Sequence, residues 1–168
     1  ISPNSVDVMK RRFSNHNQLT SLVADMESLP FDNESFDVVC SAGSLSYGDN
    51  DKVMNEVFRI LNREGVFIVV DSLNHNPIYK INRYINYLRG KRSRSVLKMM
   101  PTTILIGQYE KKFGDIEVEY FGTISWLCPF LSIFLNESKI MKFSNYIDSL
   151  FNIRKSAFKF TMIAFKKM

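Results

Sequence analysis

The order of apolar segments in residues 22–71 limits the folds that this chain can adopt. Residues 36–41 and 66–70 are compact apolar runs with β-branched side chains, as in strands that are buried on both faces. Between them, apolar residues recur at helical spacing, which is typical of an amphipathic helix. Strand, helix and strand in this order predict a parallel βαβ unit, which favours an enzyme over a scaffold.

Further helices and strands are expected on both sides of this unit. Pro3 lies near the start of an amphipathic helix, Asp49 or Asn50 caps the central helix, and Gly65 marks the end of that helix. Pro77 opens another helix. The remaining expected elements are a strand at residues 19–24, a helix at residues 102–112 and late strands at residues 116–120 and 158–165 that suit antiparallel pairing.

The length of the chain, 168 residues, suits one compact domain and is too short for two ordinary ones. We therefore expect a single α/β domain over residues 1–168, in which residues 73–157 include a basic helical segment and an apolar insert or lid. Open parallel sheets bind ligands outside the carboxyl ends of their strands. The candidate site residues are therefore those at the strand tips, namely Asp25, residues 41–43 and residues 71–76.

Several classes of protein are disfavoured by composition. Cys40 and Cys128 are the only cysteines and lie far apart, so we expect no disulfide framework, no metal site and a reducing, cytoplasmic setting. The longest apolar run, residues 124–135, is interrupted by serine and proline and is shorter than the roughly 20 residues of a membrane-spanning helix. The first residues show no secretory signal pattern.

Positive charge is concentrated in one segment. The net charge is +5, and no acidic residue occurs in residues 72–109. The segment is either a solvated helix and loop or a surface for an anionic membrane, a phosphorylated substrate or nucleic acid, of which nucleic acid is the least favoured. The basic residues proposed for such a contact are Lys80, Arg83, Arg89 and Arg92.

Asp25 and Met26 have the chemistry of an adenine-binding pair. A carboxylate at a strand tip can accept a hydrogen bond from the adenine amino group, and the next backbone N–H can donate to the adjacent ring nitrogen. The alternative is that Asp25 only caps the turn before Pro30.

Four motifs, taken together, resemble a known family. They are LVADMESLPFD at residues 22–32, SFDVVC at residues 35–40, EVFRIL at residues 56–61 and GVFI at residues 65–68. Their order and spacing are similar to those of class I S-adenosylmethionine-dependent methyltransferases of the small-molecule kind, called type 11. The resemblance covers residue 1 to about residue 77 and is looser beyond that point. It implies a Rossmann-like sheet with a helical insert before the last strand.

The resemblance also implies a cofactor site and a truncation. In the family, a strand, a G-x-G-x-G turn, a helix and a second strand with an acidic end precede the region matched here. The sequence holds no such turn, so the resemblance implies an N-terminally truncated fragment without the first two strands. In S-adenosylmethionine binding, Ile1 would line the adenine face, Asp25 and Met26 would bind adenine, and Ser41 and Ala42 would lie beside the methionine portion.

By the same resemblance, the complete protein would methylate a small molecule, with lipid-linked and sugar-linked acceptors as candidates, while the fragment itself would be inactive. His75 could act as a general base and Tyr47 could line the acceptor pocket, although His75 also suits a simple turn position. The competing hypothesis is a non-catalytic module that binds nucleic acid or an anionic membrane through its basic segment. The expected location is cytoplasmic, with peripheral membrane contact as an option.

Overall fold

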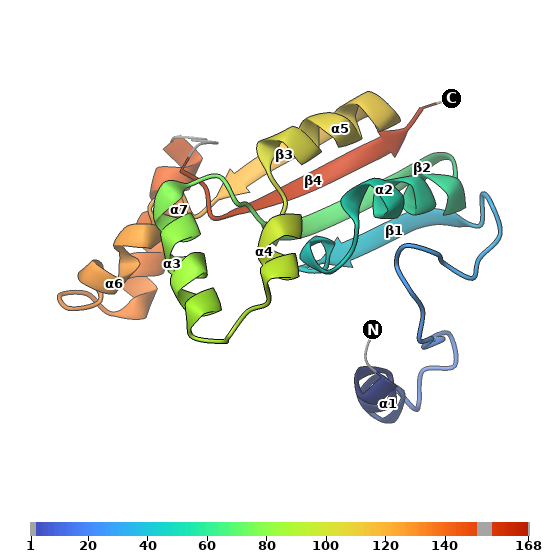
Figure 1. Cartoon of the computed structure of the whole chain (residues 1–168), viewed down its shortest axis with the longest axis horizontal. Coiled ribbons are helices and arrows are strands. Elements are labelled where there is room, and N and C mark those ends of the chain that lie inside the picture. The colour runs from blue at the N-terminus through green and yellow to red at the C-terminus, as the bar shows by residue number, and fades with distance from the viewer. Residues whose placement is uncertain (1–2, 151–155, 168) are drawn as a thin grey trace.

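A four-stranded mixed sheet organises the chain in the computed structural model, which describes residues 3–150 and 156–167 (Figure 1). The strands, in the spatial order β1-β2-β4-β3, are β1 (Phe36–Ala42), β2 (Leu61–Ser72), β4 (Lys159–Lys166) and β3 (Gly114–Phe121). β1 and β2 are parallel, and β4 is antiparallel to both β2 and β3. The carboxyl ends of β1, β2 and β3 therefore lie at the same edge of the sheet. The expected α/β class and the antiparallel last strand are confirmed.

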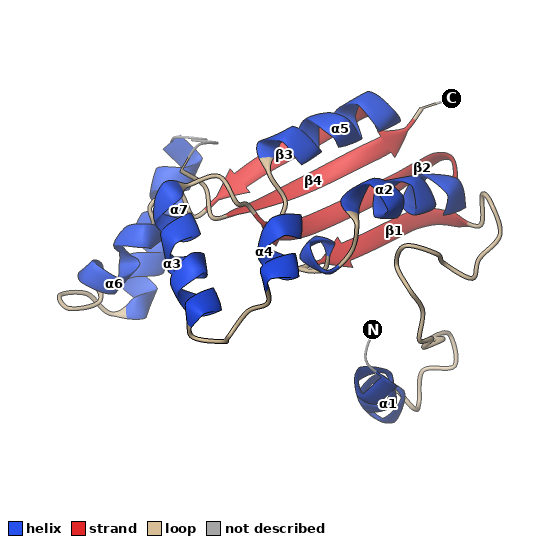
Figure 2. Ribbon diagram, viewed as in Figure 1, coloured by secondary structure: helices blue, strands red, loops and turns tan. Residues whose placement is uncertain are grey.

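Helices α2 (Asn50–Ile60) and α5 (Thr103–Phe113) cover one face of the sheet (Figure 2). The short elements η1 (Leu45–Tyr47) and α4 (Arg94–Met99) lie beside them, and the sequence did not predict α4. The core between these helices and the sheet contains the rings of Phe67, Tyr109 and Phe113, whose centroids lie 5.7 to 6.3 Å apart. Burial of these large rings removes much apolar surface from water and so stabilises this half of the molecule.

The central helix begins as predicted but ends earlier than Gly65. The Asp49 side chain accepts hydrogen bonds from the backbone N–H groups of Asp51 and Lys52, which makes it the N-cap of α2. The helix ends at Ile60, because the fully buried Leu61 already belongs to β2. Gly65 lies in a bulge of that strand, where a Cβ atom would come within 2.8 Å of the Asn62 carbonyl oxygen.

Residues 19–24 were predicted to be a strand, and this prediction is wrong. The segment is not part of the sheet, so the sheet has four strands where the sequence indicated five. Its apolar side chains Leu19, Leu22 and Val23 are exposed, so a strand here would gain neither burial nor a ladder within the described residues. The predicted N-terminal helix does form, as α1 (Pro3–Arg12), and lies apart from the sheet (Figure 1).

A second group of helices gathers at the carboxyl edge of the sheet (Figure 1). Its members are α3 (Pro77–Leu88), α6 (Cys128–Leu131) with the preceding η2 (Ser125–Leu127), and α7 (Glu137–Leu150). The Tyr79 hydroxyl of α3 donates to the Gly122 carbonyl, and the Asp148 carboxylate of α7 accepts from the backbone N–H groups of Gly122 and Thr123. We call α3, α6 and α7 the end cap. No helix of the described residues is long and apolar enough to cross a membrane.

Candidate functional site

The tips of β1 and β2 meet at the carboxyl edge of the sheet. Ser41 and Ala42 pair with Val69 and Val70 in parallel register, and the Gly43 N–H donates to the Val70 carbonyl at 2.9 Å. Gly43 has φ +64°, which favours glycine, and a Cβ atom there would have nothing within 4 Å. Two predicted site residues, Ser41 and Ala42, therefore border an open surface at the tip of β1.

Asp71 holds the loop after β1 against the tip of β2. This buried carboxylate accepts a hydrogen bond from the Leu45 N–H at 3.0 Å and another from the Ser72 N–H. Burial raises the pKa of Asp71, and the two backbone donors oppose that rise. Tyr47, the predicted acceptor-site residue, ends the 3₁₀ helix that Asp71 anchors, and its side chain is largely exposed.

Asp25 and Met26 form a turn at the same edge. The Asp25 side chain accepts a hydrogen bond from the Glu27 N–H at 2.9 Å and therefore caps the turn. The side chain is nevertheless exposed. The Met26 side chain packs against the core and against Gly48, where a Cβ atom would lie 3.0 Å from the Met26 sulfur. Gly48 follows the loop that Asp71 anchors, so the Asp25 turn lies next to the β1 tip.

Glu27 ties this turn to the start of α2. Its carboxylate accepts from the Asp49 N–H at 2.8 Å and from the Lys52 ammonium at 3.0 Å. The hydrogen bond from Asp49, followed by that from Lys52, lowers the pKa of Glu27. The sequence analysis assigned no role to Glu27, and a charged pair so distant in sequence leaves no local pattern.

Glu56 and Arg59 of α2 hold the loop that follows. Glu56 accepts from the Leu29 N–H at 2.9 Å and is paired with Arg59 at 2.9 Å. The Arg59 guanidinium also donates to the carbonyl oxygens of Leu29 and Phe31 and to the Asn33 side chain. The hydrogen bond from Arg59 and then that from Leu29 lower the pKa of Glu56. These two residues lie in the EVFRIL motif, and their contacts explain why it accompanies LVADMESLPFD.

His75 lies in the loop between β2 and α3 and is half-buried. Both of its neighbours are fixed: the Asn74 N–H donates to the Pro101 carbonyl at 2.7 Å, and the Asn76 side chain caps α3 by accepting from the Ile78 N–H. His75 is thus at the carboxyl edge with Ser41 and Ala42, and its role as a base stays a prediction. Ile1, the remaining predicted cofactor residue, lies outside the described residues.

Arg83 is not a surface residue, so its predicted place in the basic surface is wrong. Only 6% of it is exposed, and its guanidinium donates to the Leu73 carbonyl and to the Asn74 side chain, both at 3.0 Å. The guanidinium also lies over the rings of Tyr79 and Phe158. Burial lowers the pKa of Arg83 to about 10. Its alkyl stem and these ring contacts draw it inward, while Lys80, Arg89 and Arg92 are exposed.

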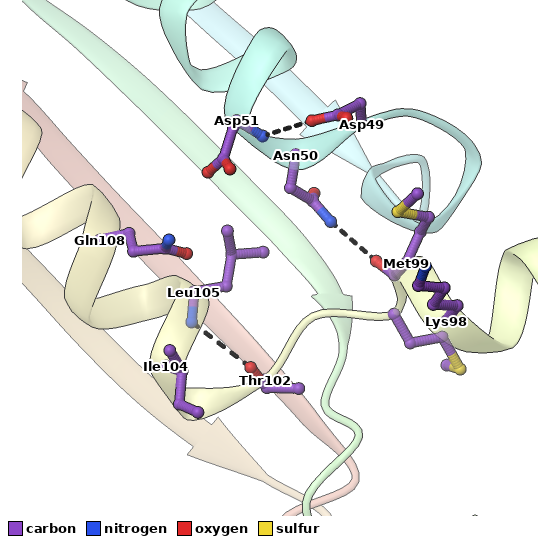
Figure 3. A pocket seen from close by; sticks show the side chains of 10 residues that line it. Asp49, Asn50, Asp51, Lys98, Met99, Thr102, Ile104, Leu105 and Gln108 are labelled. Carbon is purple, nitrogen blue, oxygen red and sulfur yellow. Dashed lines mark hydrogen bonds between the residues drawn. The ribbon is translucent and has the colours of Figure 1, made fainter.

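A pocket of about 300 Å³ opens between the start of α2 and the link from α4 to α5 (Figure 3). The Asn50 amide nitrogen donates to the Met99 carbonyl at 2.8 Å across it, while the Asn50 side-chain oxygen is buried without a partner among the described residues. None of the predicted site residues lines this pocket. It is therefore separate from the strand-tip site.

Comparison with known proteins gives a consistent result. Residues 1–69 match the sequence profile of a family described as "Methyltransferase domain". The chain is 36% identical over 87 residues to the sterol 4-C-methyltransferase of Caenorhabditis elegans, which is 49% of this chain and 26% of that protein. The chain thus spans about a quarter of the length of this curated relative.

Two solved structures show the same fold at low sequence identity. Geranyl diphosphate C-methyltransferase from Streptomyces coelicolor, solved with Mg²⁺, geranyl diphosphate and S-adenosyl-L-homocysteine, is 17% identical with a TM-score of 0.64, covering 99% of this chain and 61% of that one. Phosphoethanolamine N-methyltransferase 2 from Haemonchus contortus, solved with phosphomonomethylethanolamine and S-adenosylhomocysteine, is 17% identical with a TM-score of 0.55, covering 94% and 39%.

Proposed function

We propose, given that this chain belongs to the class I S-adenosylmethionine-dependent methyltransferases, that the protein transfers a methyl group from S-adenosylmethionine to a small-molecule acceptor. The observation that carries the proposal is the meeting of three segments at one edge: the tip of β1, the tip of β2 and the anchored turn at Asp25. Ligands of open α/β sheets bind at this edge.

The described residues fit two parts of the cofactor. The exposed Asp25 carboxylate suits the adenine amino group, and the Met26 N–H that follows it suits the adjacent ring nitrogen. The open surface beside Ser41, Ala42 and Gly43 suits the methionine portion, because no side chain occupies it at Gly43. The Glu27 and Glu56–Arg59 contacts keep the Asp25 turn in place without the cofactor, which reduces the ordering cost of binding.

When bound, the cofactor supplies an activated methyl group on a sulfonium, and the protein supplies alignment. His75 would accept the proton that an acceptor hydroxyl or amine must lose, since a neutral imidazole can act as a base near neutral pH. Tyr47 would contact the acceptor from the loop that Asp71 holds. A lipid-linked or sugar-linked acceptor is our proposal, because the residues around this edge combine apolar and cationic surface.

We propose that this chain on its own binds the cofactor weakly. Its seven glycines include no G-x-G-x-G turn, so this sequence offers no such backbone cradle. Micromolar binding of S-adenosylmethionine to a protein of this sequence would contradict that part of the proposal. We also propose a reducing, cytoplasmic setting, because both Cys40 and Cys128 are free thiols in the structure.

The first experiment measures cofactor binding by calorimetry for the full-length protein, and for the same protein with Asp25→Ala. Loss of a hydrogen bond to a charged group should weaken binding about tenfold or more. Asp115→Ala is the matched control, because Asp115 is an exposed aspartate at the opposite end of the sheet. Equal affinities for the two variants would contradict the adenine assignment.

Transfer of a labelled methyl group to sterol, prenyl diphosphate and phosphoethanolamine acceptors then tests the reaction. Activity on neutral soluble acceptors alone would exclude an amphiphilic acceptor.

A further inference from the structure

The apolar stripe of α3 faces solvent. Ile81 is 62% exposed and Leu88 is 67% exposed, and Ile78 and Ile85 on the same stripe are also exposed. The buried residues of the helix are Tyr79 and Arg83, which lie on its other side. An amphipathic helix of a globular protein normally turns such a stripe toward the core. This helix therefore presents its most apolar side to a partner that the chain itself does not supply among the described residues.

The rest of the end cap adds to this apolar surface. Phe134, which is 84% exposed, and its neighbours Phe130 and Ile133 project from the segment around α6. Further exposed apolar side chains lie on α7, namely Met141, Phe143, Tyr146 and Leu150. Because α3 and α7 both bind the turn at residues 122–123, these side chains belong to one end of the molecule (Figure 1). Grouped exposure of this kind marks an interaction site, whereas single exposed apolar residues do not.

Positive charge flanks the same surface. The exposed basic residues of α3, α4 and the loop between them are Lys80, Arg89, Lys91, Arg92, Arg94 and Lys98. No acidic residue occurs in residues 72–109, and the ion pairs of the described chain lie outside this segment. Unpaired surface cations next to exposed aliphatic and aromatic side chains match the two layers of a bilayer interface, anionic headgroups and acyl chains.

We propose that the end cap is a docking surface for an anionic phospholipid membrane. The stripe of Ile81 and Leu88 enters the interface, and Arg89 and Arg92 contact the headgroups. A second copy of the chain is disfavoured, because pairing this face with itself would oppose like charges. Nucleic acid would use the cations and leave the apolar stripe without a role.

The location of this surface suggests how membrane docking would serve catalysis, and this step rests on the proposed function. The end cap lies at the carboxyl edge of the sheet (Figure 1). The β1 tip and His75, in the loop that follows β2, lie at the same edge. An amphiphilic acceptor would then reach the site from the membrane without crossing water. The acceptor class that follows is a membrane lipid or lipid-linked intermediate.

Vesicle sedimentation tests the proposal, with phosphatidylcholine vesicles that contain or lack phosphatidylglycerol and with no cofactor present. We expect binding to the anionic vesicles that falls with added salt. Arg89→Glu with Arg92→Glu should weaken it at least tenfold, since each lost cation is worth about fivefold. Ile81→Asp with Leu88→Asp should abolish it.

Matched controls lie on other surfaces. Val8→Asp, at an apolar residue that is 61% exposed on α1, controls for the α3 pair, and Lys10→Glu with Lys111→Glu controls for the arginine pair. Thermal unfolding should be unchanged in every variant, because all these side chains are exposed. Equal sedimentation of the α3 variant and its control would overturn the proposal.

Four further outcomes separate the alternatives. A dimer that Ile81→Asp dissociates, with no vesicle binding, would assign the face to a second copy. Binding to short DNA or RNA that only the arginine variant loses, again without vesicle binding, would assign it to nucleic acid. Vesicle binding by the full-length protein without any methyl transfer would overturn the proposed function and leave the docking surface standing. Methyl transfer by a full-length protein that does not bind vesicles would overturn the docking surface and leave the proposed function standing.

Discussion

Helices α2 and α3 have the same sequence design and opposite environments. Both are amphipathic, of 11 and 12 residues, and both begin at a side chain that caps the first turn, Asp49 in α2 and Asn76 in α3. In α2, the apolar stripe that includes Val57 is buried against the sheet, whereas the stripe of α3 is exposed. Helical periodicity therefore predicts that a segment is a helix and which residues share a face, but not whether that face meets the core.

The difference lies in what holds each helix. α2 is fixed by apolar burial, while α3 is fixed by the polar contacts of Tyr79 and Arg83 with the ends of neighbouring strands. The hydrophobic effect is proportional to the area removed from water, so an exposed stripe contributes little to folding. We attribute the exposed stripe of α3 to the proposed contact with a membrane.

The largest contrast is expected when the same charge is placed on each stripe. Val57→Asp buries an unpaired carboxylate in the core and should cost more than about 4 kcal/mol of unfolding free energy, enough to unfold a marginal domain. Leu88→Asp should change it by less than about 0.5 kcal/mol. Urea denaturation followed by circular dichroism measures both. Comparable losses would show that the α3 stripe is buried in solution.

A smaller loss is expected from Arg59→Met. The change leaves the Leu29 and Phe31 carbonyl oxygens without their donor and should lower the free energy of unfolding by more than the loss of an exposed ion pair does. It should also weaken cofactor binding by loosening the Asp25 turn. Arg63→Met is the control, because the ion pair that Arg63 forms with Glu34, at 3.7 Å, is exposed and worth less than about 1 kcal/mol. Equal destabilisation by the two variants would contradict the anchoring role of Arg59.

The pH dependence of stability should carry two opposite contributions. The pKa of Glu56 is lowered in the folded state, so its contribution is complete above 4.5, the ordinary pKa, and is lost as the pH falls through the folded pKa. The pKa of Asp71 is raised by burial, so its contribution is complete below 3.8 and is lost as the pH rises through the folded pKa. Glu56→Gln should reduce the fall in unfolding free energy that occurs as the pH is lowered. Asp71→Asn should reduce the fall in unfolding free energy that occurs as the pH is raised. Unfolding titrations at several pH values measure both slopes, and a change of the same sign in both variants would contradict these causes.

The smallest effects are expected at the two N-caps. Asp49→Ala should cost about 1 kcal/mol, as is usual for a lost cap. Asn76→Ala should cost somewhat more, because the Asn76 amide also donates to the Ser156 carbonyl at 3.3 Å. Chemical denaturation resolves both. If Asn76→Ala left the free energy of unfolding unchanged, α3 would be only loosely attached to the rest of the fold. The contrast with α2 would then be weaker.

Local patterns predicted most of the helices and the strands of the sheet, because caps, periodicity and apolar runs act over a few residues. The strand at residues 19–24 was predicted wrongly, since a strand exists only with a neighbour to pair with. Arg83 was placed on the surface because its charge, and not its stem, was considered. The links made by Glu27 and Arg59 join segments far apart in sequence, and no spacing rule within one segment could reveal them.

The position of β4 between β2 and β3 also affects how the chain reaches its native state. Val66 pairs with Phe165, and Ile116 pairs with Ala164, so each of these ladders closes a long loop. Proteins dominated by such distant pairings fold slowly, because the entropy of loop closure is lost before the contacts form. During synthesis, β2 and β3 would each have an unpaired edge until residues 159–166 leave the ribosome. Open strand edges of this kind favour aggregation, so the chain should be most prone to aggregate before β4 pairs with them.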